Sequence, residues 1–238
     1  MQPFPFVQVI RTITLPLKAQ SPEISILNDI TGDGVKDIVV GCDHCSCTSN
    51  NPCSDCNGQI IVYSGGNGAS YYTYTGTYSD SFFGGAVSHL GDINGDSVSD
   101  YAAGGGTEGI AKVFSGSTGN VLDTLTISIP GAGIGKPIAG IGDLDGDTYN
   151  DFAIGTVVSG IPTVKVFSGI DRSLIYSVAG SSSTDSFGYT ISPTDDKDND
   201  NVIDFIVGAP FYGSSGSRYV KIISGYDGST IHTYSGAR

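Results

Sequence analysis

The sequence predicts an all-β protein built from four repeats of four short strands, which is the organisation of a β-propeller. Three features support this: an acidic loop motif that occurs four times, a Ser-Gly pair at a regular distance from it, and a glycine-rich composition. Glycine accounts for 35 of 238 residues and only 15% of the residues are charged. This composition disfavours helix-rich folds because glycine destabilises helices. The 39% of hydrophobic residues is enough for a core.

The chain is strongly acidic, with 11 Lys and Arg against 24 Asp and Glu and a formal net charge of −13. Such a field repels phosphate backbones and anionic lipid surfaces, so we expect no nucleic-acid partner. No apolar run approaches the length of a membrane-spanning helix. The N-terminus lacks a basic segment followed by an apolar one, so no signal peptide is recognised in this chain.

A nine-residue acidic motif recurs without gaps along the chain. Its four copies, loops one to four, are residues 29–37, 92–100, 143–151 and 196–204. Each copy is followed by a short apolar run that ends in glycine. This order predicts that each loop joins the first strand of a repeat to a buried second strand.

A Ser-Gly pair marks a second point in every repeat. The four serines are Ser64, Ser115, Ser168 and Ser224. Each of the first three lies 28 residues before the first Asp of the next loop. In the second repeat we expect strands at about 86–90, 101–103, 111–114 and 121–127, with a Ser-Gly turn between the last two. Short strands at even spacing favour a propeller over a sandwich.

We expect residues 1–238 to form a single domain. The repeats are expected at about 18–78, 79–129, 130–182 and 183–238, with an additional outer strand in 1–17 and a Cys-rich insertion at 42–58. Four blades are the smallest closed ring, so the chain is either a small complete ring or a segment of a larger propeller. The additional strand also allows a homo-oligomer joined through end strands, because an unpaired edge needs a partner.

The acidic loops predict metal sites. Carboxylates clustered at loop positions 1, 3, 5 and 9 repel one another unless a cation neutralises them, and oxygen ligands in a flexible loop suit Ca²⁺. The side chains are Asp29, Thr31, Asp33 and Asp37; Asp92, Asn94, Asp96 and Asp100; Asp143, Asp145, Asp147 and Asp151; Asp196, Asp198, Asp200 and Asp204. We expect two to four Ca²⁺ ions, with loop one weakest because Thr31 stands at position 3.

Two other interpretations of these loops are an EF-hand and a set of simple turns. An EF-hand requires Glu at loop position 12 and flanking helices. Position 12 is Val40, Ala103, Ile154 or Val207, so the EF-hand is excluded. The other interpretation is a set of Asx turns with solvated carboxylates, and four acidic loops in register argue against it.

The repeats resemble the FG-GAP repeats of integrin α-subunit β-propellers and their bacterial relatives. The motif residues are Phe83-Gly84 and Phe187-Gly188 for the Phe-Gly half and Gly208-Ala209-Pro210 for the Gly-Ala-Pro half. The third repeat has Ile134-Gly135 instead of Phe-Gly, and the first lacks this part, with Pro22-Glu23 nearby. The resemblance covers nearly the whole chain.

The resemblance implies that Ca²⁺ is held by loop positions 1, 3, 5 and 9 and by the main-chain carbonyl at position 7. That carbonyl belongs to Tyr149 in loop three and to Val202 in loop four. The resemblance also implies an extracellular or cell-surface module that recognises proteins or glycans through loops on one face. Such a module acts in adhesion or as a scaffold, and the ligand is not identified.

The cysteines lie together in the first repeat, at Cys42, Cys45, Cys47, Cys53 and Cys56. Two C-x-x-C pairs beside His44 are also compatible with Zn²⁺. We favour two disulfides, because an extracellular setting preserves them. Free thiols are the third possibility, and an odd count leaves one cysteine over in any pairing.

We expect no catalytic site. The chain has three histidines, none in a catalytic motif, and lacks G-x-S-x-G, P-loop and H-E-x-x-H patterns. Tyr71, Tyr72 and Tyr74 are a candidate surface for stacking on sugars, although alternation on an outer strand explains them equally well. The alternative function is therefore a Ca²⁺-dependent carbohydrate-binding module associated with a secreted enzyme.

Overall fold

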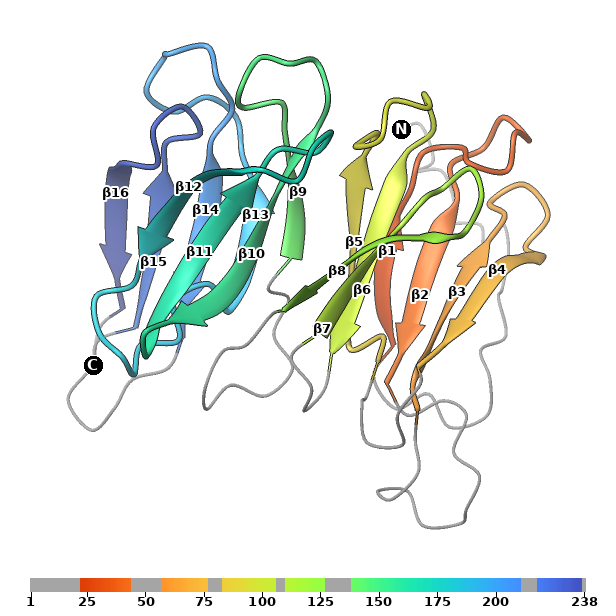
Figure 1. The fold of residues 1–238 in the computed structure, drawn as a ribbon, viewed down its shortest axis with the longest axis horizontal. Helices are drawn as coiled ribbons and strands as arrows, with labels where there is room; N and C mark the ends of the chain where they lie inside the picture. Colours follow the sequence, from red (N-terminus) through yellow and green to blue (C-terminus); the bar gives the residue numbers. More distant parts are fainter. Residues whose placement is uncertain are drawn as a thin grey trace, which may run out of the picture.

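The computed structural model describes residues 22–43, 57–76, 83–105, 110–126, 138–210 and 218–236. These residues form four separate four-stranded sheets, and in each sheet the strands are neighbours in chain order. We number the sheets blade 1 to blade 4 along the chain. Figure 1 shows them in a row, with blade 1 in red and orange at one end and blade 4 in blue at the other.

All strand pairs within the blades are antiparallel. Blade 1 contains β1 (Glu23–Ile26), β2 (Ile38–Cys42), β3 (Gln59–Tyr63) and β4 (Ser70–Thr75), and blade 2 contains β5 (Ala86–Gly91), β6 (Asp100–Gly105), β7 (Ile110–Phe114) and β8 (Val121–Thr126). Blade 3 contains β9 (Ile138–Gly142), β10 (Asp151–Val158), β11 (Ile161–Phe167) and β12 (Leu174–Ala179), and blade 4 contains β13 (Thr190–Pro193), β14 (Phe205–Ala209), β15 (Tyr219–Ile223) and β16 (Thr230–Ser235). The predicted all-β propeller with four-stranded blades is confirmed.

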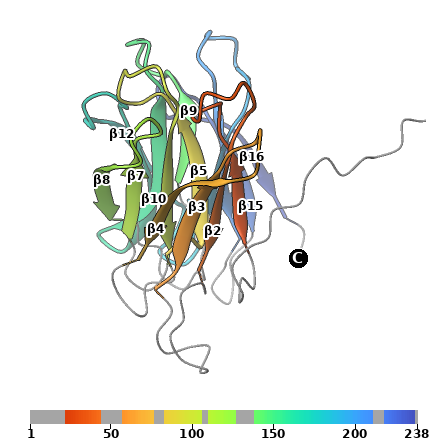
Figure 2. The same cartoon turned by 90° about the vertical axis from the view of Figure 1, so that its right-hand side faces the viewer.

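The burial of each strand follows its place in the blade. In β6 every residue except the last is buried, because both faces of this strand pack against neighbouring blades. A strand covered on both faces therefore has a continuous apolar run instead of an alternating one. The outer strand β4 alternates between exposed and half-buried residues, since only one of its faces meets another blade. Figure 2, which looks along the row from blade 1, shows the sheets stacked face to face.

Apolar clusters fill the three junctions between blades. Each combines a valine two residues before the Ser-Gly serine of one blade with an aromatic residue of the next. The pairs are Val62 with Phe114, Val113 with Phe152, and Val166 with Phe205. All six side chains are at most 1% exposed. Burying such side chains is the main apolar stabilisation that holds one blade to the next.

Hydrogen bonds reinforce the outer part of these junctions. The Tyr72 hydroxyl donates to the Ser117 carbonyl oxygen at 2.8 Å, and the Tyr176 hydroxyl donates to the Gly225 carbonyl oxygen at 2.8 Å. Each tyrosine thus reaches the Ser-Gly turn of the following blade. In blade 2 the equivalent residue is Asp123, eight residues after its Ser-Gly serine.

The row of blades is open in the described part of the chain. The first strands make extensive contacts between neighbouring blades, β1 with β5, β5 with β9 and β9 with β13, and none of this extent joins β1 to β13. The described residues therefore form an arc and not a closed four-blade ring. Each blade lies inside one predicted repeat, while the boundaries between repeats stay a prediction. The additional strand in 1–17 lies outside the described residues.

Among the residues that the structure describes, no helix is long and apolar enough to cross a membrane.

We expect Tyr176→Phe to weaken the junction between blades 3 and 4, because it removes the hydroxyl that donates to the turn of blade 4. The loss of one such bond lowers the free energy of unfolding by about 1 kcal/mol and the Tm by about 2–4 °C in a chain of this size. Thermal unfolding measures the change. Tyr226→Phe is the matched control because Tyr226 is 69% exposed. Equal Tm values for the two variants would contradict the bridging role.

Candidate metal centres

The four acidic loops occupy equivalent places in the fold. Each joins the first strand of a blade to the second, as the sequence predicts. Figure 1 shows all four loops along the upper rim of the row. Each loop is therefore surrounded by the equivalent strands and turns of its own blade.

The aspartate at loop position 9 is fully buried and joins the loop to the Ser-Gly turn of its own blade. In blade 2, Asp100 Oδ2 accepts the Ile93 N–H at 3.1 Å and Asp100 Oδ1 accepts the Gly116 N–H at 3.0 Å. The other blades repeat both bonds, from Ile30 and Gly65 to Asp37, from Leu144 and Gly169 to Asp151, and from Lys197 and Gly225 to Asp204. In the sequence the acidic loop and the Ser-Gly turn are two separate markers. These two hydrogen bonds show that both markers belong to one contact, in which the buried carboxylate joins the loop to the turn.

The glycine of each Ser-Gly pair is required by space. A Cβ atom on Gly116 would lie 1.9 Å from the Ser99 carbonyl oxygen. Gly65, Gly169 and Gly225 meet the same obstacle, each 1.9 Å from a carbonyl oxygen at loop position 8. Only a residue without a side chain permits this approach of turn and loop.

The aspartate at loop position 1 organises the turn of the loop. Asp92 Oδ1 accepts the Gly95 N–H at 2.7 Å, and Asp92 Oδ2 accepts the Ser97 N–H at 2.8 Å. Positions 4 and 6 have positive φ in all four loops. Thr148 at position 6 of loop three has φ of 77°, a conformation that costs energy for a β-branched residue.

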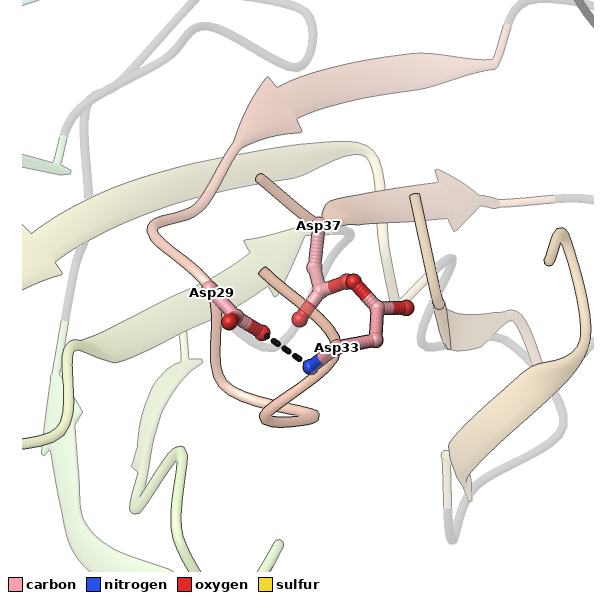
Figure 3. Close-up of side chains that lie close together, drawn as sticks. All are labelled: Asp29, Asp33 and Asp37. Carbon is pink, nitrogen blue, oxygen red and sulfur yellow. Dashed lines mark hydrogen bonds between the residues drawn. The ribbon is translucent and has the colours of Figure 1, made fainter. Parts of the chain in front are cut away.

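Three of the loops bring carboxylate oxygens within 4.8 Å of one another. The groups are Asp29, Asp33 and Asp37; Asp143, Asp145 and Asp151; and Asp196, Asp198 and Asp204. Figure 3 shows the first group, with the Asp33 N–H donating to Asp29 at 3.1 Å. In each group one carboxylate is buried and two reach the surface or lie near it, which leaves the cluster open to a cation.

The predicted ligands outside these three groups make hydrogen bonds within their own loops. In loop one, Thr31 Oγ1 donates to Asp37 Oδ1 at 3.2 Å. In loops three and four, the position-5 residues Asp147 and Asp200 each accept the main-chain N–H of position 7, both at 2.8 Å. The carbonyl groups of Tyr149 and Val202 at position 7 stay predicted ligands.

Loop two differs from the other three. Asn94 Nδ2 donates to Asp100 Oδ1 at 3.2 Å, and Asp96 Oδ2 accepts a hydrogen bond from the Ser117 hydroxyl. The amide thus satisfies the buried carboxylate, and the described residues of this loop form no group of three carboxylates at the spacing of the others.

Burial shifts the titration of the position-9 carboxylates. It raises the pKa of Asp100 and of Asp151 to about 6, although two main-chain N–H groups on each favour the ionised form. The pKa of Asp33 is lowered, mainly because the Ser64 hydroxyl donates to it. A bound cation would favour the ionised form of all these groups.

The predicted tyrosine surface divides into two parts. Tyr71 is 47% exposed, whereas Tyr72 and Tyr74 pack against the apolar cluster between blades 1 and 2. The centroid of the Tyr74 ring lies 5.1 Å from that of Phe114. Two of the three rings therefore contribute to blade packing, as expected of an alternating outer strand.

Among the cysteines, Cys42 ends β2 and is buried. Cys45, Cys47, Cys53 and Cys56 lie outside the described residues, so disulfide, zinc or free thiols stay predictions. His89 is half-buried on β5, and burial together with the charge of Lys36 lowers its pKa.

We expect Gly116→Ala to destabilise blade 2, because the new methyl group would overlap the Ser99 carbonyl oxygen. Overpacking of this kind lowers the free energy of unfolding by about 1–3 kcal/mol or more, and urea unfolding measures it. In the control Gly236→Ala the nearest atom would be 3.4 Å away, an ordinary contact. A Gly116→Ala variant as stable as this control would contradict the close approach.

Comparison with known proteins gives relatives for this architecture. No family model matches the chain. Integrin alpha-V of Gallus gallus is 29% identical over 214 residues, which cover 77% of this chain and 19% of that protein. Integrin alpha-6 of Homo sapiens is 33% identical over 137 residues, which cover 54% of this chain and 12% of that protein. The matches thus span about a fifth or less of these relatives.

A solved structure shares the fold. The crystal structure of Saccharomyces cerevisiae Sqt1 aligns with 89% of this chain and 47% of its own, with a TM-score of 0.56 and 13% sequence identity. The similarity to integrin alpha-V covers 77% of this chain. The chain is therefore a β-propeller of four-stranded blades whose sequence is similar to that of integrin α chains.

Proposed function

We propose that this chain is a Ca²⁺-stabilised binding module that acts outside the cell or on its surface, in adhesion or as a scaffold. The observation that carries the proposal is the grouping of three carboxylates within 4.8 Å in three loops on one rim. The similarity to integrin α chains supports a binding role instead of a catalytic one, with a protein as ligand.

Calcium fits the ligand set that these loops offer. Ca²⁺ accepts six to eight oxygen ligands in flexible geometry, whereas Mg²⁺ demands a near-ideal octahedron and keeps several waters. Two carboxylates within 4.8 Å repel each other by about 1 kcal/mol in water and by about 3 kcal/mol at the effective dielectric of a protein surface. A cation between them replaces this repulsion with attraction.

A bound ion would also support the junctions between blades, because the loops touch one another. Asn28, just before loop one, donates from Nδ2 to the Ser99 hydroxyl oxygen of loop two at 2.7 Å. Asn150 of loop three donates from Nδ2 to the Leu90 carbonyl oxygen of blade 2 at 3.3 Å. Ordering one loop therefore helps to position the next blade.

The carbohydrate-binding alternative has less support. A surface that stacks on sugars needs exposed aromatic rings. Of the three candidate tyrosines, only Tyr71 is exposed, at 47%. The protein-binding role is therefore the one that we propose.

We expect removal of Ca²⁺ with EDTA to lower the Tm substantially and purified protein to carry two to four Ca²⁺ ions per chain. Binding to the folded state alone stabilises by about 2.7 kcal/mol per site at a hundredfold excess over Kd. Thermal unfolding with and without EDTA, together with metal analysis, measures both quantities.

The control pair is Asp151→Asn and Asp171→Asn. Asp151 belongs to the carboxylate group of loop three. The Asp171 carboxylate is solvent-exposed, lies in the β11–β12 turn and accepts hydrogen bonds from the Ser173 N–H and from the hydroxyls of Ser173 and Ser168. Asp151→Asn should lose one site and part of the Ca²⁺-dependent Tm shift, and Asp171→Asn should keep both. Purified protein without Ca²⁺ and with no response to EDTA would refute the proposal.

We expect the Ca²⁺-dependent Tm shift to shrink as the pH falls from 7 to 5. With pKa values of about 6 in the metal-free fold, Asp100 and Asp151 bind protons that Ca²⁺ must displace. These folded-state pKa values lie above the unfolded value of 3.8. In the metal-free protein, the contribution of the two groups to the free energy of unfolding is therefore greatest below pH 3.8. It is lost as the pH rises through about 6. A Tm shift that is constant between pH 5 and 7 would exclude these carboxylates as ligands.

A further inference from the structure

The Ser-Gly turn of blade 3 carries an arginine where the other blades have glycine. The fifth residue of each turn, counted from the serine, has a positive φ, and its main-chain N–H donates to the carbonyl oxygen of that serine. In blade 3 this residue is Arg172, with φ of 66°. A residue other than glycine is strained in this conformation, and strained residues of this kind cluster at functional sites. The three glycines are Gly68, Gly119 and Gly228.

The side chain across the junction differs at the same place. At the junctions of blade 1 with blade 2 and of blade 3 with blade 4, a tyrosine ring of the preceding blade lies on the turn glycine. A Cβ atom on that glycine would lie 2.5 Å or 2.8 Å from the ring; the pairs are Tyr72 with Gly119 and Tyr176 with Gly228. Blade 2 has Asp123 at the position of these tyrosines. At the junction of blades 2 and 3, an aspartate and Arg172 therefore replace the tyrosine and the glycine.

The Arg172 side chain reaches back across this junction to loop two. Its Nη1 donates to the Ile93 carbonyl oxygen at 3.1 Å, and Ile93 is position 2 of that loop. The Ile93 N–H in turn donates to the buried Asp100 carboxylate at 3.1 Å. Burial lowers the pKa of the guanidinium, and the charges of Asp123, Asp100 and Asp171 oppose this shift. Arginine stays protonated in proteins, so a permanent cation lies beside loop two.

Loops one and three receive no such cation from the turn that faces them. A Cβ atom on the Ser-Gly glycine of blades 2, 3 and 4 would lie at most 3.2 Å from the side chain at loop position 2 of the preceding blade. The turn of blade 2 therefore faces loop one, and the turn of blade 4 faces loop three. Their fifth residues are Gly119 and Gly228. Of these three loops, only loop two has a guanidinium from the facing turn.

We propose that Arg172 competes with Ca²⁺ for the carboxylates of loop two and makes this loop the weakest of the four sites. The Asn94 amide acts in the same direction, because it already donates to Asp100 Oδ1 at 3.2 Å. This inference rests on the Ca²⁺ binding proposed above. It differs from the sequence-based expectation, in which Thr31 makes loop one the weakest.

The competition couples the metal to the junction between blades 2 and 3. If Arg172 lowers the affinity of loop two for Ca²⁺, then Ca²⁺ in loop two weakens the Arg172 contact by the same factor. At low Ca²⁺ the guanidinium joins the two blades through the Ile93 carbonyl group. At high Ca²⁺ the ion neutralises the loop-two carboxylates instead. Loop two therefore responds at Ca²⁺ concentrations at which the other loops are already occupied.

The test is a calorimetric titration of the metal-free chain with Ca²⁺, in which the unsubstituted chain should show one site weaker than the rest. Arg172→Gln should tighten that site about tenfold, because a unit charge within about 8 Å of a divalent ion changes its Kd by about this factor. Arg172→Gly should have the same effect, since it restores the glycine of the other blades and relieves the strained φ. Arg172→Lys keeps the charge and is the matched control, with a Kd close to that of the unsubstituted chain.

A double variant assigns the effect to loop two. Asp96→Asn removes a carboxylate from this loop, so its addition to Arg172→Gln should weaken the tightened site again. Equal Kd values for the weakest site in Arg172→Gln and in the unsubstituted chain would overturn the proposal, although Ca²⁺ binding at the other loops would stand. A chain that binds no Ca²⁺ at all would refute the proposed function and this inference with it.

Thermal unfolding separates this role from ordinary packing. In EDTA, Arg172→Gln should lower the Tm, because Asp100 and Asp123 lose a nearby cation. In excess Ca²⁺ the difference from the unsubstituted chain should shrink, since the variant binds the ion more tightly at loop two. A loss of Tm of the same size in both conditions would mean that the residue is purely structural and would overturn the competition.

Discussion

The buried carboxylate at loop position 9 is the interaction on which each blade depends. Asp100 accepts one main-chain hydrogen bond from its own loop and one from the Ser-Gly turn, so a single side chain joins the two connections of a blade. The turn must approach the loop so closely that only glycine fits. This contact explains why both markers recur together in all four repeats.

The same carboxylate links stability to metal binding. Burial makes a carboxylate in this position costly to ionise. Two N–H donors lower this cost but do not remove it, because the pKa of Asp151 is still about 6. The neighbouring aspartates make ionisation harder. In loop two the Asn94 amide donates a hydrogen bond to this carboxylate, whereas loops one, three and four place further carboxylates beside it. The groups of three carboxylates in loops one, three and four are therefore the ones that a bound cation would stabilise.

Sequence patterns predicted what is local to one repeat. The acidic loops, the turns and the strands of blade 2 follow from turn chemistry and from apolar runs within a few residues. Contacts between blades were not predictable, because they join residues far apart in sequence. The bond from Tyr72 to Ser117 spans 45 positions, and the Arg172 guanidinium meets the Ile93 carbonyl oxygen across 79. For the same reason the sequence left open whether Tyr72 and Tyr74 face solvent or another blade.

The number of blades is likewise not a property of a single repeat. Ile24 and Val87 occupy the same register position with side chains of similar size, yet one is exposed and the other buried. Their difference comes only from whether a blade precedes them. Each repeat therefore specifies two faces, and whether a given face is buried depends on the neighbouring blade.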